Sequence, residues 1–278
     1  MAPALQSREY KLMLQAPRFA GSEASLIAQV EAFWQDFSAA IGAAGLATAG
    51  TLTRAKERPV TFYDTTEHHL SNPDVLFRDY VFRARGRDDG SAKVTLKYRH
   101  PDRLVAGDRD ISAAKKLVKK TDIKFEKDVK PVLGRMRSLY SYSNSGRTTG
   151  AFSVRRVEDI MTMFPGLEAH LDVDTGTAVF PVGGFTAREL VFAGSRLSLT
   201  TRQSAECAVV VWYDASGDPA RPVVAEFSFR HQETKPKDPR FRAAEARATY
   251  LAFRTALALE AWVDPTQQTK TAYVYHLR

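Results

Sequence analysis

The segments RDYVFRAR (residues 78–85) and AKVTLKYR (residues 92–99) decide the predicted fold of this chain. Apolar and polar residues alternate in both, which is the pattern of β-strands whose successive side chains point to opposite faces. The first strand then carries Arg83 and Arg85 on its polar face, and the second carries Lys97. A short turn containing a glycine separates the two segments, so we expect them to form an antiparallel hairpin.

Further strands are indicated along the rest of the chain. They are predicted over residues 8–14, 60–64, 123–129, 186–192, 196–201, 208–213 and 223–231. Few helices interrupt them, which favours an antiparallel sheet or a closed barrel over a sheet built from βαβ units. Residues 135–149 are rich in Ser, Asn and Gly, and we expect them to form a mobile connection.

Two long amphipathic helices are predicted at residues 22–41 and 239–263, and a shorter one over 154–164. The expected fold class is therefore α+β: an antiparallel closed β-barrel of about eight strands, a tunnel fold, with flanking helices. We expect a single domain over residues 1–278, with two strand-rich halves joined around residues 130–165.

The polar faces of five strands carry many charges. For any one strand, the simplest expectation is that this face contacts water, as in many antiparallel sheets. In a barrel whose apolar faces pack outward beneath the helices, the charged rows instead meet inside. Converging cations repel unless an anion or interleaved carboxylates neutralise them. A polyphosphate supplies that charge, because planar Arg groups match phosphate oxygens. Nearby carboxylates could then hold Mg²⁺ or Mn²⁺, which share oxygen ligands with phosphates.

Short motifs occur along these strands in a fixed order. They are Ser7-Arg8-Glu9-Tyr10-Lys11, Phe62-Tyr63-Asp64-Thr65, Arg83-Ala84-Arg85, Thr95-Leu96-Lys97 and Lys124-Phe125-Glu126-Lys127-Asp128, followed by the late strand Val224–Arg230. In this order the chain resembles the CYTH superfamily, the triphosphate tunnel metalloenzymes. The resemblance implies a β-barrel tunnel that hydrolyses a triphosphate or organic polyphosphate with Mg²⁺ or Mn²⁺, and adenylate cyclase chemistry is a related possibility.

The resemblance also implies roles for individual residues. Catalysis would involve Glu9, Lys11 and Glu126. Substrate phosphates would be bound by Lys11, Arg83, Arg85, Lys97, Arg99, Lys124 and Arg230. The metal would be held by Glu9, Glu126, Asp128 and Glu226. Two positions depart from the family pattern, since Ser7 and Ser228 stand where carboxylates are expected. Losing anionic ligands weakens a divalent-cation site, which favours a second hypothesis: a non-catalytic binder of polyphosphate or a phosphorylated metabolite.

The composition limits the classes of partner. The 278 residues include 40 Lys and Arg against 32 Asp and Glu, giving a net charge of +8 that attracts anionic partners. Nucleic acid is the third hypothesis, supported by the Lys115–Lys120 cluster but by no standard nucleic-acid-binding motif.

The single cysteine, Cys207, excludes an intramolecular disulfide. No long apolar run or targeting segment is evident, so we expect a cytoplasmic protein with no membrane partner.

Overall fold

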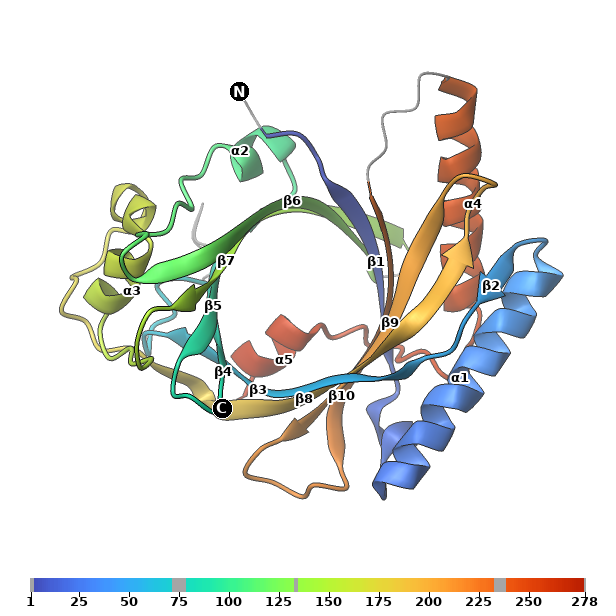
Figure 1. The fold of residues 1–278 in the computed structure, drawn as a ribbon, viewed down its shortest axis with the longest axis horizontal. Helices are drawn as coiled ribbons and strands as arrows, with labels where there is room; N and C mark the ends of the chain where they lie inside the picture. The colour runs from blue at the N-terminus through green and yellow to red at the C-terminus, as the bar shows by residue number, and fades with distance from the viewer. Residues whose placement is uncertain (1–2, 72–78, 133–134, 233–238, 278) are drawn as a thin grey trace.

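The computed structural model describes residues 3–71, 79–132, 135–232 and 239–277. Their strands join one sheet, drawn as a ring in Figure 1. The strands are β1 (Ser7–Leu14), β2 (Ala47–Ala49), β3 (Thr53–Asp64), β4 (Tyr80–Gly86), β5 (Ala92–His100), β6 (Val118–Val132), β7 (Arg135–Thr148), β8 (Phe180–Ser198), β9 (Ser204–Asp214) and β10 (Pro222–Gln232). The helices are α1 (Glu23–Ala43), α2 (Arg103–Gly107), α3 (Val157–Met163), α4 (Pro239–Leu257) and α5 (Lys270–Tyr275).

The sheet closes because β8 pairs with both β3 and β9. Among the described residues, the ring runs β8-β3-β4-β5-β7-β6-β1-β10-β9 and returns to β8, while β2 is attached outside it. The expected α+β architecture, a closed barrel with flanking helices, is confirmed at this level. Two details of the prediction are wrong. The described ring has nine strands and not eight, and it is mixed because β1 and β6 run parallel.

The ninth strand comes from a segment that was expected to be a connection. Strand β7 pairs with β5 over Lys93–His100 and with β6 along most of its length. Ser141, Ser143 and Ser145 lie opposite inward residues of β5, and the Ser, Asn and Gly content of the segment is what had indicated a connection. Strand β8 also differs, because it is continuous where two strands were predicted. A bulge at Gly194, with φ of +115°, lies between them.

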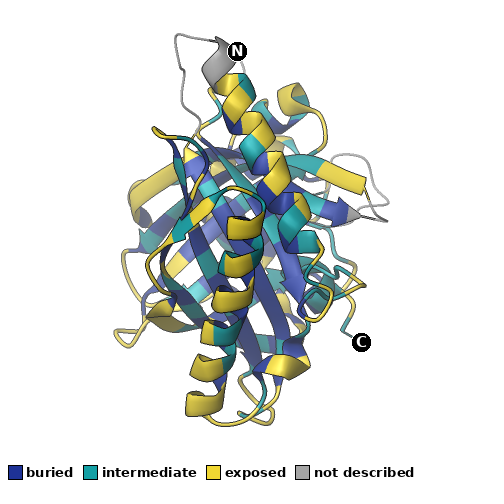
Figure 2. Cartoon of the chain, turned by 90° about the vertical axis from the view of Figure 1, so that its right-hand side faces the viewer, coloured by how far each residue is buried: buried dark blue, intermediate teal, exposed yellow. Residues whose placement is uncertain are grey.

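The outer face of the barrel is covered by helices on two sides. Phe227 of β10 packs beneath α1, with ring centroids 5.0 Å from Phe33 and 4.8 Å from Phe37. Figure 2 shows α1 and α4 with exposed residues on their outer sides and buried residues toward the barrel. On the other side, Tyr80 and Phe82 of β4 belong to a second core that includes residues of α3. The described helices include none with the length and apolar composition needed to cross a bilayer.

Part of the barrel interior is also apolar. Helix α5 is drawn within the ring in Figure 1, and its Val274 is buried in a cluster with Met13, Phe62 and Trp212. The hydroxyl of Tyr275 donates to Asp64, with Oη 3.1 Å from Oδ2. Asp64 also accepts three backbone N–H groups of the loop that follows it. The aromatic-Asp-Thr motif therefore anchors both this loop and α5.

The packing of β10 beneath α1 generates a stability prediction. Phe227→Ala removes a fully buried ring from between two helix aromatics, so we expect a loss of about 3–5 kcal/mol in the free energy of unfolding. Tyr250→Ala is the matched control, because this α4 side chain is 53% exposed, and it should change stability little. Urea unfolding measures both. Equal effects would contradict the assignment of this face as the core.

Candidate functional site

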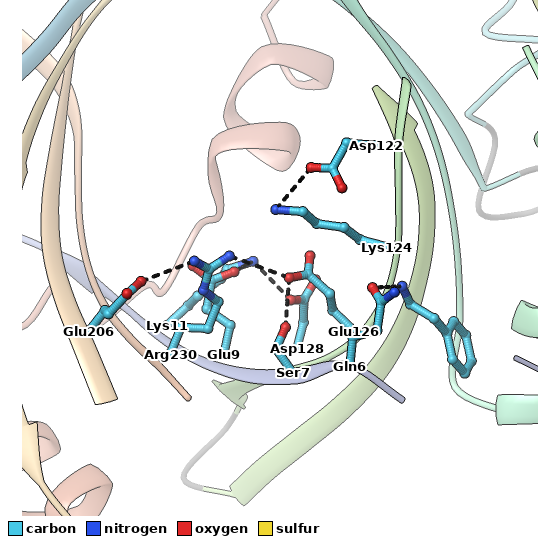
Figure 3. Close-up of polar contacts among 11 residues, drawn as sticks. Gln6, Ser7, Glu9, Lys11, Asp122, Lys124, Glu126, Asp128, Glu206 and Arg230 are labelled. Carbon is cyan, nitrogen blue, oxygen red and sulfur yellow. Dashed lines mark hydrogen bonds and ion pairs between the residues drawn. The ribbon is translucent and has the colours of Figure 1, made fainter. Parts of the chain in front are cut away.

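The polar face of the strands points into the barrel. The register places Glu9 of β1 between Arg230 of β10 and Asp128 of β6, and it places Ser7 beside Glu126. Figure 3 shows these side chains, drawn as sticks, directed toward one another in the barrel interior. Three strands that are far apart in sequence thus bring together most of the acidic residues that were expected to form the site.

Lys11 lies at the centre of this acidic group. Its Nζ is 2.9 Å from Glu9 Oε2 and 3.0 Å from Asp128 Oδ1. Burial alone would lower the pKa of Lys11, but attraction to Asp128 and Glu9 raises it above the ordinary value. Burial would likewise raise the pKa of both carboxyls, yet the neighbouring ammonium holds each below its usual range. All three groups are therefore charged at neutral pH.

The neighbouring carboxylate, Glu126, is also occupied by protein groups. Its Oε1 accepts a hydrogen bond of 2.8 Å from Ser7 Oγ and lies 3.7 Å from Arg230 Nη1. Arg230 in turn donates to Glu206 over 3.1 Å. Ser7 thus supplies a hydrogen-bond donor to Glu126.

The fourth expected metal ligand, Glu226, binds a residue of the C-terminal helix. Its Oε1 lies 2.7 Å from Nζ of Lys270, the first residue of α5. Lys270 also lies 5.7 Å from the ring centroid of Trp212, which is close enough for a cation–π contact. A lysine that sequence reasoning did not identify therefore neutralises Glu226.

A second charged cluster, centred on Glu189 of β8, was also missed. Glu189 accepts from Arg58 Nε over 2.7 Å and from Trp212 Nε1 over 3.0 Å, and Arg85 Nε lies 3.9 Å away. Burial would raise the pKa of Glu189, but Lys270, Arg85 and Arg58 lower it to about 2. The sequence signal for this cluster is weak, because Arg188 and Glu189 are adjacent charges that point to opposite faces of the strand, and no short motif marks either of them.

Three cations on the opposite side of the ring have no such carboxylate, and we call Arg83, Lys97 and Arg99 the cation wall. Among the residues that the structure describes, none forms an ion pair with these three, and Arg83 Nε has no hydrogen-bond partner. Arg83 is instead placed over the ring of Phe62, with Cζ 6.0 Å from its centroid. Strands β4 and β5 pair with Thr95 opposite Arg83, so the wall spans two adjacent strands.

Burial lowers the pKa values of two of these cations. Burial lowers the pKa of Arg83 to about 9, and the charge of Arg85 contributes. Burial also lowers the pKa of Lys97 to about 8; attraction to Asp128 opposes this fall, and repulsion by Lys11 and Arg99 adds to it. Both residues remain mainly cationic at neutral pH. The cation wall thus holds positive charge that no described carboxylate meets at ion-pair distance, although Asp128 attracts Lys97 and Glu189 attracts Arg83 from further away.

The remaining expected phosphate ligand, Lys124, is more exposed to solvent than Lys11. Its Nζ is 3.4 Å from Asp122, and its side chain is 39% exposed. Because Lys124 is on an inward face of a closed barrel, this exposure shows that solvent reaches the interior. A separate surface pocket of about 350 Å³ is lined in part by Lys119, Lys120 and Arg147. Lys115 and Lys116 are exposed in the turn before β6.

The four expected metal ligands do not fit a divalent cation in this arrangement. Each already contacts a cationic group of the protein: Glu9 and Asp128 contact Lys11, Glu126 contacts Arg230, and Glu226 contacts Lys270. Within the described ranges, no three His, Cys, Asp or Glu side chains are grouped so that they could hold a metal ion. These four carboxylates are therefore engaged by cations of the protein itself.

Comparison with known proteins assigns no family to the chain. No family model matches it. No curated protein matches it significantly. The resemblance to the CYTH superfamily rests on the ordered motifs, and the geometry above is the basis for a functional proposal.

The Glu189 cluster generates a prediction about stability and pH. Glu189→Gln leaves Arg58 and Arg85 without their shared anion, so we expect a loss of about 3 kcal/mol at pH 7. The folded-state pKa of about 2 lies below the ordinary value of 4.5, so this stabilisation is present above pH 4.5 and disappears as pH falls toward 2. The free energy of unfolding of the wild type and of Glu189→Gln, measured with denaturant from pH 7 to pH 3, tests this prediction. Glu31→Gln, on the exposed side of α1, is the control, and an equal loss there would refute the assignment.

Proposed function

We propose that this protein binds a polyphosphate or a triphosphate-bearing small molecule inside its barrel, with the phosphates on the cation wall of Arg83, Lys97 and Arg99. The observation that carries the proposal is the unequal pairing of charges in the interior. Every expected acidic residue is paired with a cation of the protein, whereas these three cations have no described carboxylate partner. An anionic ligand supplies the missing charge.

The chemistry of the wall suits phosphate oxygens. Two guanidinium groups offer planar pairs of N–H donors, and Lys97 adds a compact ammonium. Hydroxyl groups lie beside them in the register, because Ser143 pairs with Lys97 and Ser141 pairs with Arg99. The hydroxyl of Ser141 is fully buried and has no partner in the described part of the chain. It could donate to a ligand oxygen only if the neighbouring side chains moved to admit one.

We propose binding as the function of this site. Hydrolysis is a separate reaction, which can be measured on the same samples. Metal-dependent phosphohydrolases use carboxylates to hold the ions that activate water and neutralise charge in the transition state. Here those carboxylates are engaged by Lys11, Arg230 and Lys270. The resemblance supports hydrolysis or cyclisation of a triphosphate, and the charge pairing supports a binder.

Isothermal titration with tripolyphosphate in the presence of EDTA tests the proposal. We expect binding by the wild type and a loss of at least about tenfold in affinity for Arg83→Met/Lys97→Met, since each charged hydrogen bond contributes about 1.5–3 kcal/mol. The control, Lys115→Met/Lys116→Met, removes the same charge from an exposed turn and should bind as the wild type does. Equal losses of affinity in both variants would contradict binding at the cation wall and would indicate a site on the outer surface. Phosphate release with Mg²⁺ or Mn²⁺, measured on the same samples, would show turnover.

The same titration as a function of pH tests the role of Lys97. Because its pKa lies at about 8, Lys97 is cationic at pH 7 and loses its charge as pH rises through that value. Asp128, Lys11 and Arg83 face the same interior, and Arg83, whose pKa is about 9, loses its charge at a higher pH than Lys97 does. We expect affinity for tripolyphosphate to fall between pH 7 and pH 9.5 in the wild type. In Lys97→Arg the fall should be smaller, and an identical pH profile would exclude Lys97 from the binding site.

A further inference from the structure

Glu9 and Asp128 are held side by side by the backbone of the barrel. They occupy partner positions on β1 and β6, which pair in parallel, so both carboxylates point inward at the same level. Lys11 follows Glu9 by two residues on the same strand and therefore shares its face. Its ammonium contacts both carboxylates, at 2.9 Å and 3.0 Å. The register of the two strands thus places the ammonium of Lys11 between the carboxylates of Glu9 and Asp128.

Contacts of the same kind recur at Glu126 and Glu226, the other two expected metal ligands. Lys270 approaches Glu226 to 2.7 Å from α5, and Arg230 approaches Glu126 to 3.7 Å from β10. Both carboxylates are almost completely buried, with exposed fractions of 5% for Glu226 and 6% for Glu126. Buried carboxylates need a counter-charge, and here the protein supplies it at every one of these positions.

We propose that Lys11 is a built-in counter-cation that takes the place of a divalent metal ion between Glu9 and Asp128, so that the barrel binds polyphosphate without a metal. This inference rests on the proposed function and specifies its ionic requirement. A divalent ion at this position would meet the ammonium of Lys11 at close range, and like charges repel. It would also have to displace contacts that the strand register keeps in place.

The loss of Lys11 would expose a cation site. Without the ammonium, Glu9 and Asp128 are adjacent anions in the same interior region as Glu126, and each carboxylate repels the others. Oxygen ligands of this kind suit Mg²⁺ and Mn²⁺. Lys11→Met keeps much of the length and the apolar stem of the side chain and removes its charge.

Titration of Mn²⁺ alone, followed by electron paramagnetic resonance without any phosphate, tests this inference. We expect Lys11→Met to bind Mn²⁺ at least tenfold more tightly than the wild type. Lys11→Arg is the matched control, because it keeps the cation, and it should resemble the wild type. Lys11→Met/Asp128→Asn should lose the gained site. Wild-type protein that binds Mn²⁺ as tightly as Lys11→Met, or a folded Lys11→Met that gains no affinity, would overturn the inference.

A second measurement on the wild type alone keeps the inference testable if Lys11→Met does not fold. The affinity for tripolyphosphate, measured with EDTA and then with Mg²⁺, should not increase when the metal is present. An increase of tenfold or more with Mg²⁺ would overturn the metal-free assignment while leaving polyphosphate binding intact. Absence of tripolyphosphate binding under both conditions would instead refute the proposed function, so the two failures are distinguishable.

Discussion

Closing a β-sheet into a ring forces every second side chain inward, where charges cannot all reach bulk water. In this protein the inward rows of β1, β4, β5, β6 and β10 carry lysines, arginines and carboxylates, so the interior must balance its own charge. Strand register decides which charges can meet. It places Lys11 with Glu9 and Asp128, and it leaves Arg83 and Lys97 on the other side of the ring. The arrangement of the candidate site follows from this balance.

The apolar cluster around Val274 borders the charged region of the barrel interior. Helix α5 brings Val274 into contact with residues from several strands, and its Lys270 reaches Glu226 at the border of the two regions. Trp212 joins both regions, because its ring belongs to the apolar cluster while its Nε1 donates to Glu189. In the charged region burial itself lowers the pKa of Lys97, whereas attraction to Lys270, Arg85 and Arg58 outweighs burial at Glu189 and lowers its pKa.

The sequence predicted the inward residues of the barrel better than their partners. Alternation around Arg83 and Lys97 identified the polar face, because a strand has a period of two and its other face is apolar. The same pattern cannot show whether β6 runs parallel or antiparallel to β1, and that direction sets the contact between Glu9 and Asp128. Lys270 lies on a helix too short to produce a clear periodic signal, so its pairing with Glu226 needed the three-dimensional structure.

The central claim is that the interior cations without a described ion-pair partner, Arg83, Lys97 and Arg99, bind phosphate oxygens. A crystal structure of the protein with tripolyphosphate, grown with EDTA, tests this most directly. We expect phosphate density inside the ring within hydrogen-bonding distance of Arg83, Lys97 and Arg99, with Lys11 still bridging Glu9 and Asp128. Phosphate density confined to exposed lysines such as Lys115 and Lys116, with an interior that holds no ligand, would contradict it.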